Sequence, residues 1–174
     1  MKNIAVVVPS IRIKESIPIF MEAWQSLFNK HNVEFILVND TEDKPFVLHD
    51  NKRIDLESDL VSNKCAGVRQ LGFLYIAQNL PNIEYIFTTD DDCFPIGDPI
   101  QDHIDQLNRK VPISWISTAT NAYMRGFPYQ VREEAEVKFS HGIWRGVPDY
   151  DAPTQLLTPK EFEPIYYKGV IPKG

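Results

Sequence analysis

The pattern of apolar and polar positions predicts a series of buried strands. Residues 4–8 (IAVVV) form a β-branched apolar run that is followed by Pro9 and Ser10. Residues 33–40 and 84–92 repeat this pattern, each with an apolar run that ends in aspartate. Such runs are typical of strands that are buried on both faces of a parallel sheet. The sequence therefore predicts three strands of this kind, each with polar residues at its end.

Amphipathic segments lie between these strands and predict helices. After the first strand, apolar residues recur at helical spacing as far as a turn at residues 29–32, and Pro18 suits the first turn of this helix. Residues 61–79 carry a second apolar stripe, and residues 101–110 (QDHIDQLNRK) resemble a third helix in their pattern. Strands and helices thus alternate along this part of the chain.

This alternation predicts an α/β fold, with a Rossmann-like, mostly parallel sheet and flanking helices over residues 1–120. Residues 41–60 are charged and irregular, apart from a short strand near residues 53–56, and residues 113–118 predict a further strand. Residues 121–174 contain many prolines and few clear periodicities, so we expect a loop-rich C-terminal third. We expect the 174 residues to form one domain.

Polar residues at three strand ends predict a ligand site, because ligands of open α/β sheets bind beyond the carboxyl ends of the strands. Pro9, Ser10 and Arg12 follow the first strand, Asp40 ends the second, and the triplet at 90–92 ends the third. Neighbouring carboxylates repel each other unless a divalent cation offsets their charge, and hard oxygen ligands favour Mg²⁺ or Mn²⁺. The alternative is a solvated turn or a cap on the following helix.

Composition narrows the range of partners. The net charge of −6 argues against a nucleic acid or an anionic membrane as a partner. Cys65 and Cys93 have neither metal-ligand spacing nor the density of a disulfide scaffold, which fits a reducing, cytoplasmic compartment. The apolar N-terminal run is too short for a signal peptide, and we expect no membrane span.

Six segments of the chain carry a resemblance to known families. The segment IFTTDDDC is similar to the Asp-x-Asp strand end of nucleotide-sugar glycosyltransferases with the A-type fold. The segments are VPSIR (8–12), RQLGF (69–73), IFTTDDDC (86–93), MRGFPYQVRE (124–133), HGIWRGVPDYDAPTQL (141–156) and PKG (172–174). Through these segments, in order along nearly the whole chain, the sequence resembles the reversibly glycosylated polypeptides, a family that includes UDP-arabinopyranose mutases. The resemblance is weakest over residues 41–60.

This resemblance implies a nucleotide-sugar-binding domain with a metal ion and a UDP-sugar. Asp90 and Asp92 would flank Mn²⁺ or Mg²⁺. Arg12 and Asp40 would lie in the uridine pocket, and Arg69 would reach the diphosphate, with Lys64 as a less secure second cation. The alternatives are that Arg69 is only a surface charge and that Asp40 is only a turn residue. The residues implied to bind substrate in this half of the chain are Pro9, Ser10, Arg12, Asp40, Arg69 and Asp91.

Arg125 aligns with the arginine that members of the family glycosylate reversibly. A guanidinium is a poor nucleophile because it stays charged, so an electrostatic role at the leaving diphosphate is easier to defend. A surface arginine before a turn is the alternative. A second cluster is assigned collectively to substrate binding, with core packing as the alternative for its aromatic members. It consists of His141, Trp144, Asp149, Tyr150 and Asp151.

The resemblance implies a UDP-arabinopyranose mutase-like enzyme that interconverts UDP-pentopyranose and UDP-pentofuranose. The alternatives are a metal-dependent glycosyltransferase, which would transfer the sugar to an acceptor or to itself, and a non-catalytic subunit or fragment that needs a full-length partner. Chains of the family continue past the segment that matches residues 172–174, so we expect an incomplete site and a homo- or hetero-oligomer.

Overall fold

A five-stranded mixed sheet forms the centre of the part of the chain that the computed structural model describes, residues 3–56 and 64–108. The strand order is β4-β3-β2-β1-β5. The strands in chain order are β1 (Ile4–Ser10), β2 (Glu34–Asn39), β3 (Phe46–His49), β4 (Lys52–Ile54) and β5 (Tyr85–Thr88). The chain divides into two compact units, Met1–Ile100 and Gln101–Gly174, and the sheet belongs to the first.

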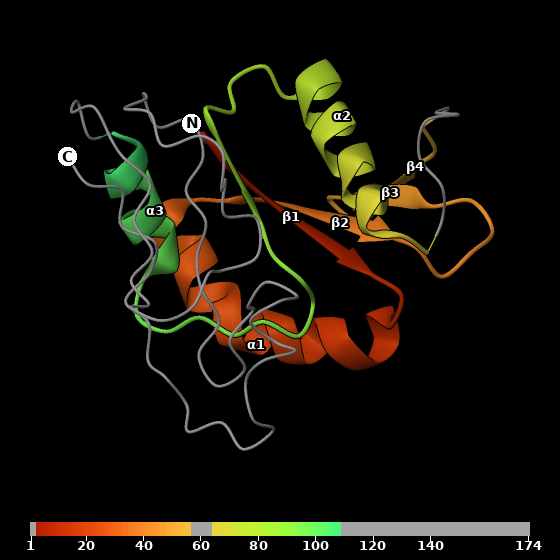
Figure 1. Cartoon of the computed structure of the whole chain (residues 1–174), viewed down its shortest axis with the longest axis horizontal. Helices are drawn as coiled ribbons and strands as arrows, with labels where there is room; N and C mark the ends of the chain where they lie inside the picture. The colour runs from red at the N-terminus through yellow and green to blue at the C-terminus, as the bar shows by residue number, and fades with distance from the viewer. Residues whose placement is uncertain (1–2, 57–63, 109–174) are drawn as a thin grey trace, which may run out of the picture. The chain divides into compact units, whose positions relative to one another are not determined.

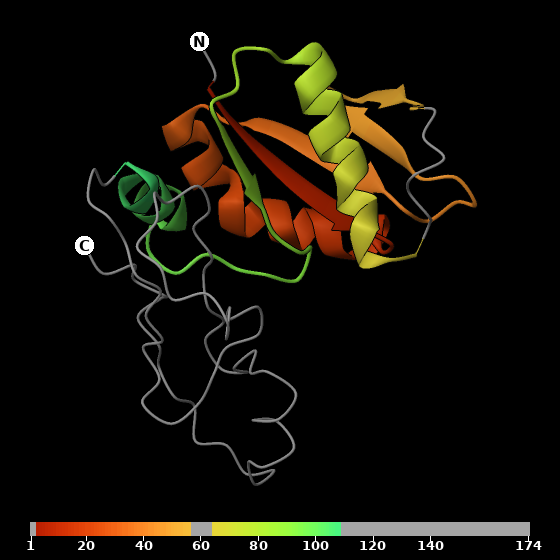
Figure 2. The ribbon, with the colours of Figure 1, turned by 45° about the horizontal axis from the view of Figure 1, so that its top comes forward.

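The three strands predicted from the apolar runs are the parallel ones. β1 is central and pairs with β2 on one side and β5 on the other, so that Val7 faces both Ile36 and Thr88. Figure 1 shows β1 beside β2, and Figure 2 shows β5 along the other side of β1, with the carboxyl ends of the three strands toward the same edge. Parallel strands bring the residues that follow them to one edge of the sheet, and this arrangement positions the site.

Helices cover the two faces of this sheet. They are α1 (Ile13–His31) and α2 (Gln70–Asn79), which follows the 3₁₀ turn η1 (Ala66–Arg69). A third helix, α3 (Pro99–Leu107), lies in the sequence across the boundary between the two units. Figure 2 shows α2 in front of the strands and α1 behind them. The α/β fold with flanking helices is therefore confirmed.

Aromatic rings attach α1 to its face of the sheet. The ring centroid of Phe20 lies 6.2 Å from that of Phe35 in β2, and the ring centroid of Trp24 lies 5.7 Å from that of Phe87 in β5. Phe20 and Trp24 stack on each other at 5.5 Å. Burial of large aromatic side chains contributes about 2 to 3 kcal/mol each, so this stack fixes the middle of α1 against β2 and β5.

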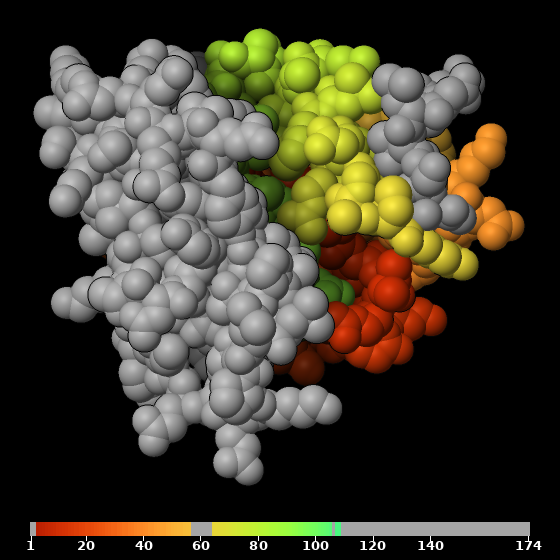
Figure 3. Space-filling view, viewed as in Figure 1, coloured from red at the N-terminus to blue at the C-terminus, as the bar shows by residue number. Residues whose placement is uncertain are grey.

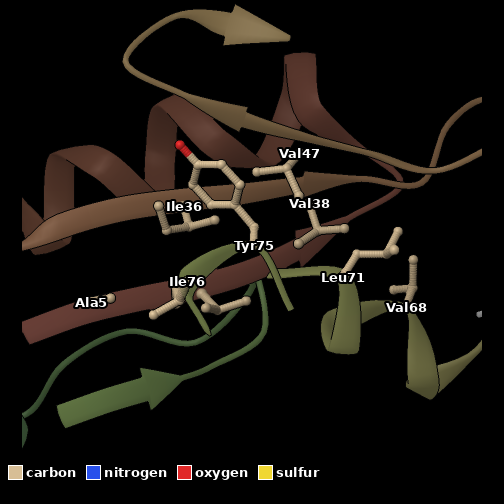
Figure 4. Packing of buried hydrophobic residues seen from close by; sticks show 9 residues of the cluster. Ala5, Ile36, Val38, Val47, Val68, Leu71, Tyr75 and Ile76 are labelled. Carbon is tan, nitrogen blue, oxygen red and sulfur yellow. The ribbon is translucent and has the colours of Figure 1, made fainter. Parts of the chain in front are cut away.

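A second core lies between α2 and the opposite face. In Figure 4, Tyr75, Ile76 and Leu71 of α2 point toward Ile36 and Val38 of β2. Gly72 permits this close packing, because a Cβ atom at this position would lie 2.5 Å from Cγ1 of Val7. The apolar runs of β1 and β2 are therefore buried, as predicted. The prediction is wrong for β5, which has no buried residue and whose Ile86 is 47% exposed.

Several boundaries differ from the predictions. α1 begins at Ile13, so Pro18 lies inside the helix and not in its first turn. The Arg12 carbonyl accepts hydrogen bonds from the N–H groups of Glu15 and Ser16, which closes a turn before the proline. The helix predicted over residues 61–79 begins only at η1 and α2, and residues 57–63 lie outside the described residues.

The region that was predicted to be irregular contains a hairpin. β3 is antiparallel to β2 and to β4, so the sheet is less purely parallel than predicted. Asp50 and Asn51 connect β3 to β4 with φ angles of 50° and 60°, values that asparagine and aspartate tolerate better than most residues. β5 ends at Thr88, so the aspartate triplet follows the strand and is not part of it.

Other predictions lie outside the described residues, including the strand at residues 113–118 and the loops of residues 121–174. The division into a single domain with a core of residues 1–120 stays a prediction. Over residues 3–56 and 64–108, no helix is both long enough and apolar enough to cross a membrane.

Candidate functional site

A cleft of about 350 Å³ lies at the carboxyl ends of β1, β2 and β5. In Figure 3, the yellow surface of the η1 region lies next to the red surface where β1 leads into α1. The cleft brings together every predicted site residue that the structure describes. These residues are Pro9, Ser10, Arg12, Asp40, Arg69, Asp90, Asp91 and Asp92. The predicted convergence of three strand ends is therefore found, whereas the roles of the individual residues stay predictions.

Asp91 anchors the acidic turn to the end of β1. Its side chain is buried, and Ser10 Oγ donates a hydrogen bond of 2.6 Å to Oδ2. Arg12 Nη2 donates a hydrogen bond of 2.8 Å to Oδ1, and the Arg12 backbone N–H donates to Ser10 Oγ at 3.0 Å. Both carboxylate oxygens of Asp91 thus have partners within the protein. The contact with Asp91, and then that with Asp92, raises the pKa of Arg12 above its ordinary value.

Arg69 lies beside the first carboxylate of the turn. Its Nη2 donates to Asp90 Oδ1 at 2.7 Å, and its Nε donates to the Ala66 carbonyl at 3.3 Å. Nη1 lies 3.4 Å from Thr88 Oγ1, which itself donates to the Val7 carbonyl at 3.1 Å. The guanidinium is therefore held at the mouth of the cleft by both η1 and β5.

Asp90 and Asp92 are the two carboxylates of the cleft that could hold a hard cation. Their side chains are 49% and 64% exposed, and a carboxylate oxygen of each lies within 4.8 Å of the other and of Cys93 Sγ. Burial raises the pKa of Cys93 to about 11. A thiol is also a soft ligand, whereas Mg²⁺ and Mn²⁺ favour oxygen. Two exposed carboxylates at this spacing fit one Mg²⁺ or Mn²⁺ ion.

Asp40 lies on the opposite side of the cleft and has an incomplete set of hydrogen bonds. Its side chain is 2% exposed, and Oδ2 accepts a hydrogen bond of 2.6 Å from the backbone N–H of Lys64. Within the described residues, Oδ1 is buried and has no hydrogen-bond partner. Burial raises the pKa of Asp40, and the contact with Lys64 opposes this effect. A buried acceptor without a donor is costly, so this oxygen suits a ligand donor.

Two contributions to the cleft were not predicted from the sequence. Lys64 was expected to supply its charge, whereas its backbone N–H holds Asp40. Thr88 was not selected at all, although it supports Arg69. Arg12 was placed with Asp40 in the prediction, whereas its side chain contacts Asp91 and, at 3.2 Å, Asp92. A sequence gives little indication of which backbone N–H group will donate to a side chain, or of the direction in which a long side chain will point.

The remaining predicted site residues lie outside the described residues. They are Arg125, His141, Trp144, Asp149, Tyr150 and Asp151.

Comparisons with known proteins give a consistent result. The family model described as "Reversibly glycosylated polypeptide" matches residues 1–173. The chain is 30% identical to "Probable UDP-arabinopyranose mutase 1" of Zea mays over 97% of its length and 51% of that protein. It is 29% identical to "UDP-arabinopyranose mutase 1" of Oryza sativa subsp. japonica, with the same two coverages.

The chain is also 30% identical to "UDP-arabinopyranose mutase 2" of Arabidopsis thaliana, over 97% of its length and 52% of that protein. It thus spans about half the length of the curated relatives that it matches. No solved structure matches the chain significantly. Because the family model extends over almost the whole sequence, the chain belongs to the reversibly glycosylated polypeptide family.

Proposed function

We propose that the cleft binds a UDP-sugar together with Mn²⁺ or Mg²⁺, and that the chain acts as a UDP-arabinopyranose mutase-like protein. One observation carries this proposal: a buried, unpartnered carboxylate oxygen and a pair of exposed carboxylates flanked by guanidiniums line the same cleft. The names of the relatives support the choice of sugar nucleotide.

Asp40 would recognise the base. Uracil presents one ring N–H, at N3, between two carbonyl groups. An ionised carboxylate accepts hydrogen bonds and donates none, so Oδ1 of Asp40 suits this N–H. The bond would satisfy an acceptor that lacks a partner in the described protein and would therefore favour uracil over a base without that donor.

The other side of the cleft would hold the diphosphate. Asp90 and Asp92 would hold the divalent cation, which would neutralise the diphosphate as it leaves the sugar. Arg12 and Arg69 are the guanidiniums near enough to bind phosphate oxygens. An acidic chain with a net charge of −6 needs this local positive charge to bind a diphosphate.

The mutase reaction requires a cleft that retains both parts of its substrate. The bond between the anomeric carbon and the phosphate oxygen breaks, and the electron pair stays with UDP. At the anomeric carbon C1, a bond to O4 forms as the bond to the ring oxygen O5 breaks, and the O4 proton passes to O5. The bond between C1 and the same phosphate then forms again. Residues that bind UDP throughout, Asp40 and Arg69 among them, would prevent its loss. Arg125, outside the described residues, is proposed to stabilise the charge that develops on the sugar.

Chromatography of the nucleotide sugars tests this proposal. The full chain is incubated with UDP-arabinopyranose and Mn²⁺, without an acceptor, alone and together with a full-length relative. A mutase forms UDP-arabinofuranose and accumulates no free UDP. In a parallel incubation with an acceptor, release of UDP in step with the loss of the acceptor would indicate a transferase. Activity only in the mixture with the relative would indicate a subunit. Absence of the furanose form under both conditions would contradict the mutase proposal.

A further inference from the structure

The guanidiniums of the cleft already pair with the two carboxylates that a metal ion would use. Arg69 Nη2 lies 2.7 Å from Asp90 Oδ1, and Arg12 Nη2 lies 3.2 Å from Asp92 Oδ2. A divalent cation bound between Asp90 and Asp92 would therefore lie close to two positive charges. In the absence of a nucleotide, the arginines and the metal ion compete for the same pair of carboxylates.

The two arginines differ in what they would retain if the metal ion bound. Arg12 also contacts Asp91, which is 8% exposed in its side chain, so Arg12 keeps a buried carboxylate partner when Asp92 turns to the metal. Among the described residues, Asp90 is the one carboxylate that Arg69 contacts. Its other contacts are the Ala66 carbonyl and Thr88 Oγ1, both longer than 3 Å and both neutral.

Arg69 is therefore the group that has to find a new anionic partner. The side chain is 27% exposed and lines the cleft, so the guanidinium can turn from Asp90 to an incoming anion without a change in the backbone. A diphosphate offers oxygens that suit the planar fork of a guanidinium. Such an exchange leaves Asp90 to the metal ion and Arg69 to the phosphate, and each carboxylate and cation keeps a partner of opposite charge.

We propose that Arg69 is an internal counterion that blocks the metal site in the empty cleft and transfers to the diphosphate when nucleotide and metal bind together. This inference rests on the proposed metal role of Asp90 and Asp92. It assigns to Arg69 two opposite effects, since Arg69 weakens the binding of the metal alone and strengthens the binding of the nucleotide with metal. The chain therefore binds Mn²⁺ and UDP cooperatively and holds little metal without nucleotide.

The experiment measures both effects on the full chain and its variants. Free Mn²⁺ is titrated by electron paramagnetic resonance without nucleotide, and UDP is titrated by calorimetry at saturating Mn²⁺. Arg69→Gln should bind Mn²⁺ alone about fivefold more tightly and UDP with Mn²⁺ about tenfold more weakly. Arg69→Met, which keeps the aliphatic stem, should change both affinities in the same directions.

Arg53→Gln provides the matched control, because it removes the same charge at a site outside the cleft. Arg53 pairs with Glu42 and Asp55 and lies over the ring of Phe46, so its loss should leave both affinities unchanged. Arg69→Lys retains the charge and should bind Mn²⁺ alone about as weakly as the parent chain. Circular dichroism and urea midpoints show whether each variant is folded.

Two results would overturn the inference, and they are distinguishable. If the parent binds UDP with Mn²⁺ but the neutral Arg69 variants bind Mn²⁺ alone no more tightly than Arg53→Gln does, the exchange is wrong and the proposed function stands. If the parent binds no Mn²⁺ even with UDP, the metal role in the proposed function fails and the exchange fails with it.

Discussion

The two sides of the cleft hold buried carboxylates that the protein treats differently. Asp91, beyond β5, receives hydrogen bonds on both oxygens, from Ser10 and from Arg12. Asp40, directly after β2, receives one on Oδ2, and its Oδ1 has no partner among the described residues. We therefore expect Asp91 to stabilise the fold and propose that Asp40 accepts a hydrogen bond from a ligand, although both follow a strand end.

The largest expected effect is on the free energy of unfolding, when Asp91 and Asp40 are each replaced by asparagine. Asp91→Asn places an amide N–H₂ group against Ser10 or Arg12, both of which are donors, and should lower the free energy of unfolding by about 2 kcal/mol. Asp40→Asn keeps an acceptor for Lys64 and removes a buried charge, so it should change stability by less than about 0.5 kcal/mol. Urea denaturation measures both values, and equal losses would contradict the distinction.

Asp40→Asn should instead change the preferred base. The amide oxygen is required by the Lys64 N–H, so the N–H₂ group replaces Oδ1 and opposes the N3–H group of uracil. UDP affinity should fall about tenfold, whereas CDP, whose base has an acceptor at N3, should bind more tightly than to the parent. Asp50→Asn, on the β3–β4 turn, is the matched control and should leave both nucleotides unaffected. Calorimetric titrations with the two nucleotides measure the change.

Ser10→Ala, which changes a partner of Asp91, should lower the free energy of unfolding by less than Asp91→Asn does. The change removes one of the two donors to Asp91 and leaves the Arg12 contact in place. The free energy of unfolding should fall by about 1 kcal/mol. Thr41→Ala serves as the control, because Thr41 Oγ1 donates to Asn39 in an exposed turn. A loss no greater than in the control would show that Asp91 does not depend on Ser10.

The smallest expected effect is the pH dependence contributed by Asp40. Burial raises the folded-state pKa of this carboxyl above its unfolded value, so the folded chain binds the proton more tightly. Asp40 therefore destabilises the fold at neutral pH, and this cost disappears as the pH falls through the raised pKa toward the ordinary value of about 4. The stability of the parent relative to Asp40→Asn should rise over this interval. A flat difference would contradict the burial of the charge.

Much of the central fold could be predicted because its signal is local. The apolar run at residues 4–8 is long enough to specify a strand that is covered on both faces, and β1 is that strand. The four residues of β3 (FVLH) are too few to show a period, and their hairpin depends on two turn residues with positive φ angles. Pro18 was misplaced because a proline inside a helix and one in its first turn leave the same local signal.

The site could likewise be predicted only in part, because its contacts join residues that are far apart in the sequence. The sequence identifies three consecutive aspartates, but only the fold determines which of them is buried. Asp91 points inward because Ser10 and Arg12, 81 and 79 residues away along the chain, supply its donors. Its neighbours on each side are left exposed, with oxygens close enough together for one cation. The free oxygen of Asp40 depends likewise on the backbone of Lys64, a contact with no sequence signature.

The most direct test of the central claim is the affinity of the full chain for UDP with Mn²⁺ and in excess chelator, measured by calorimetry. The account predicts that chelation abolishes measurable binding, that Asp92→Ala does the same at saturating Mn²⁺, and that Asp50→Ala, at an exposed carboxylate outside the cleft, binds as the parent does. Equal UDP affinity with and without the metal ion would contradict it.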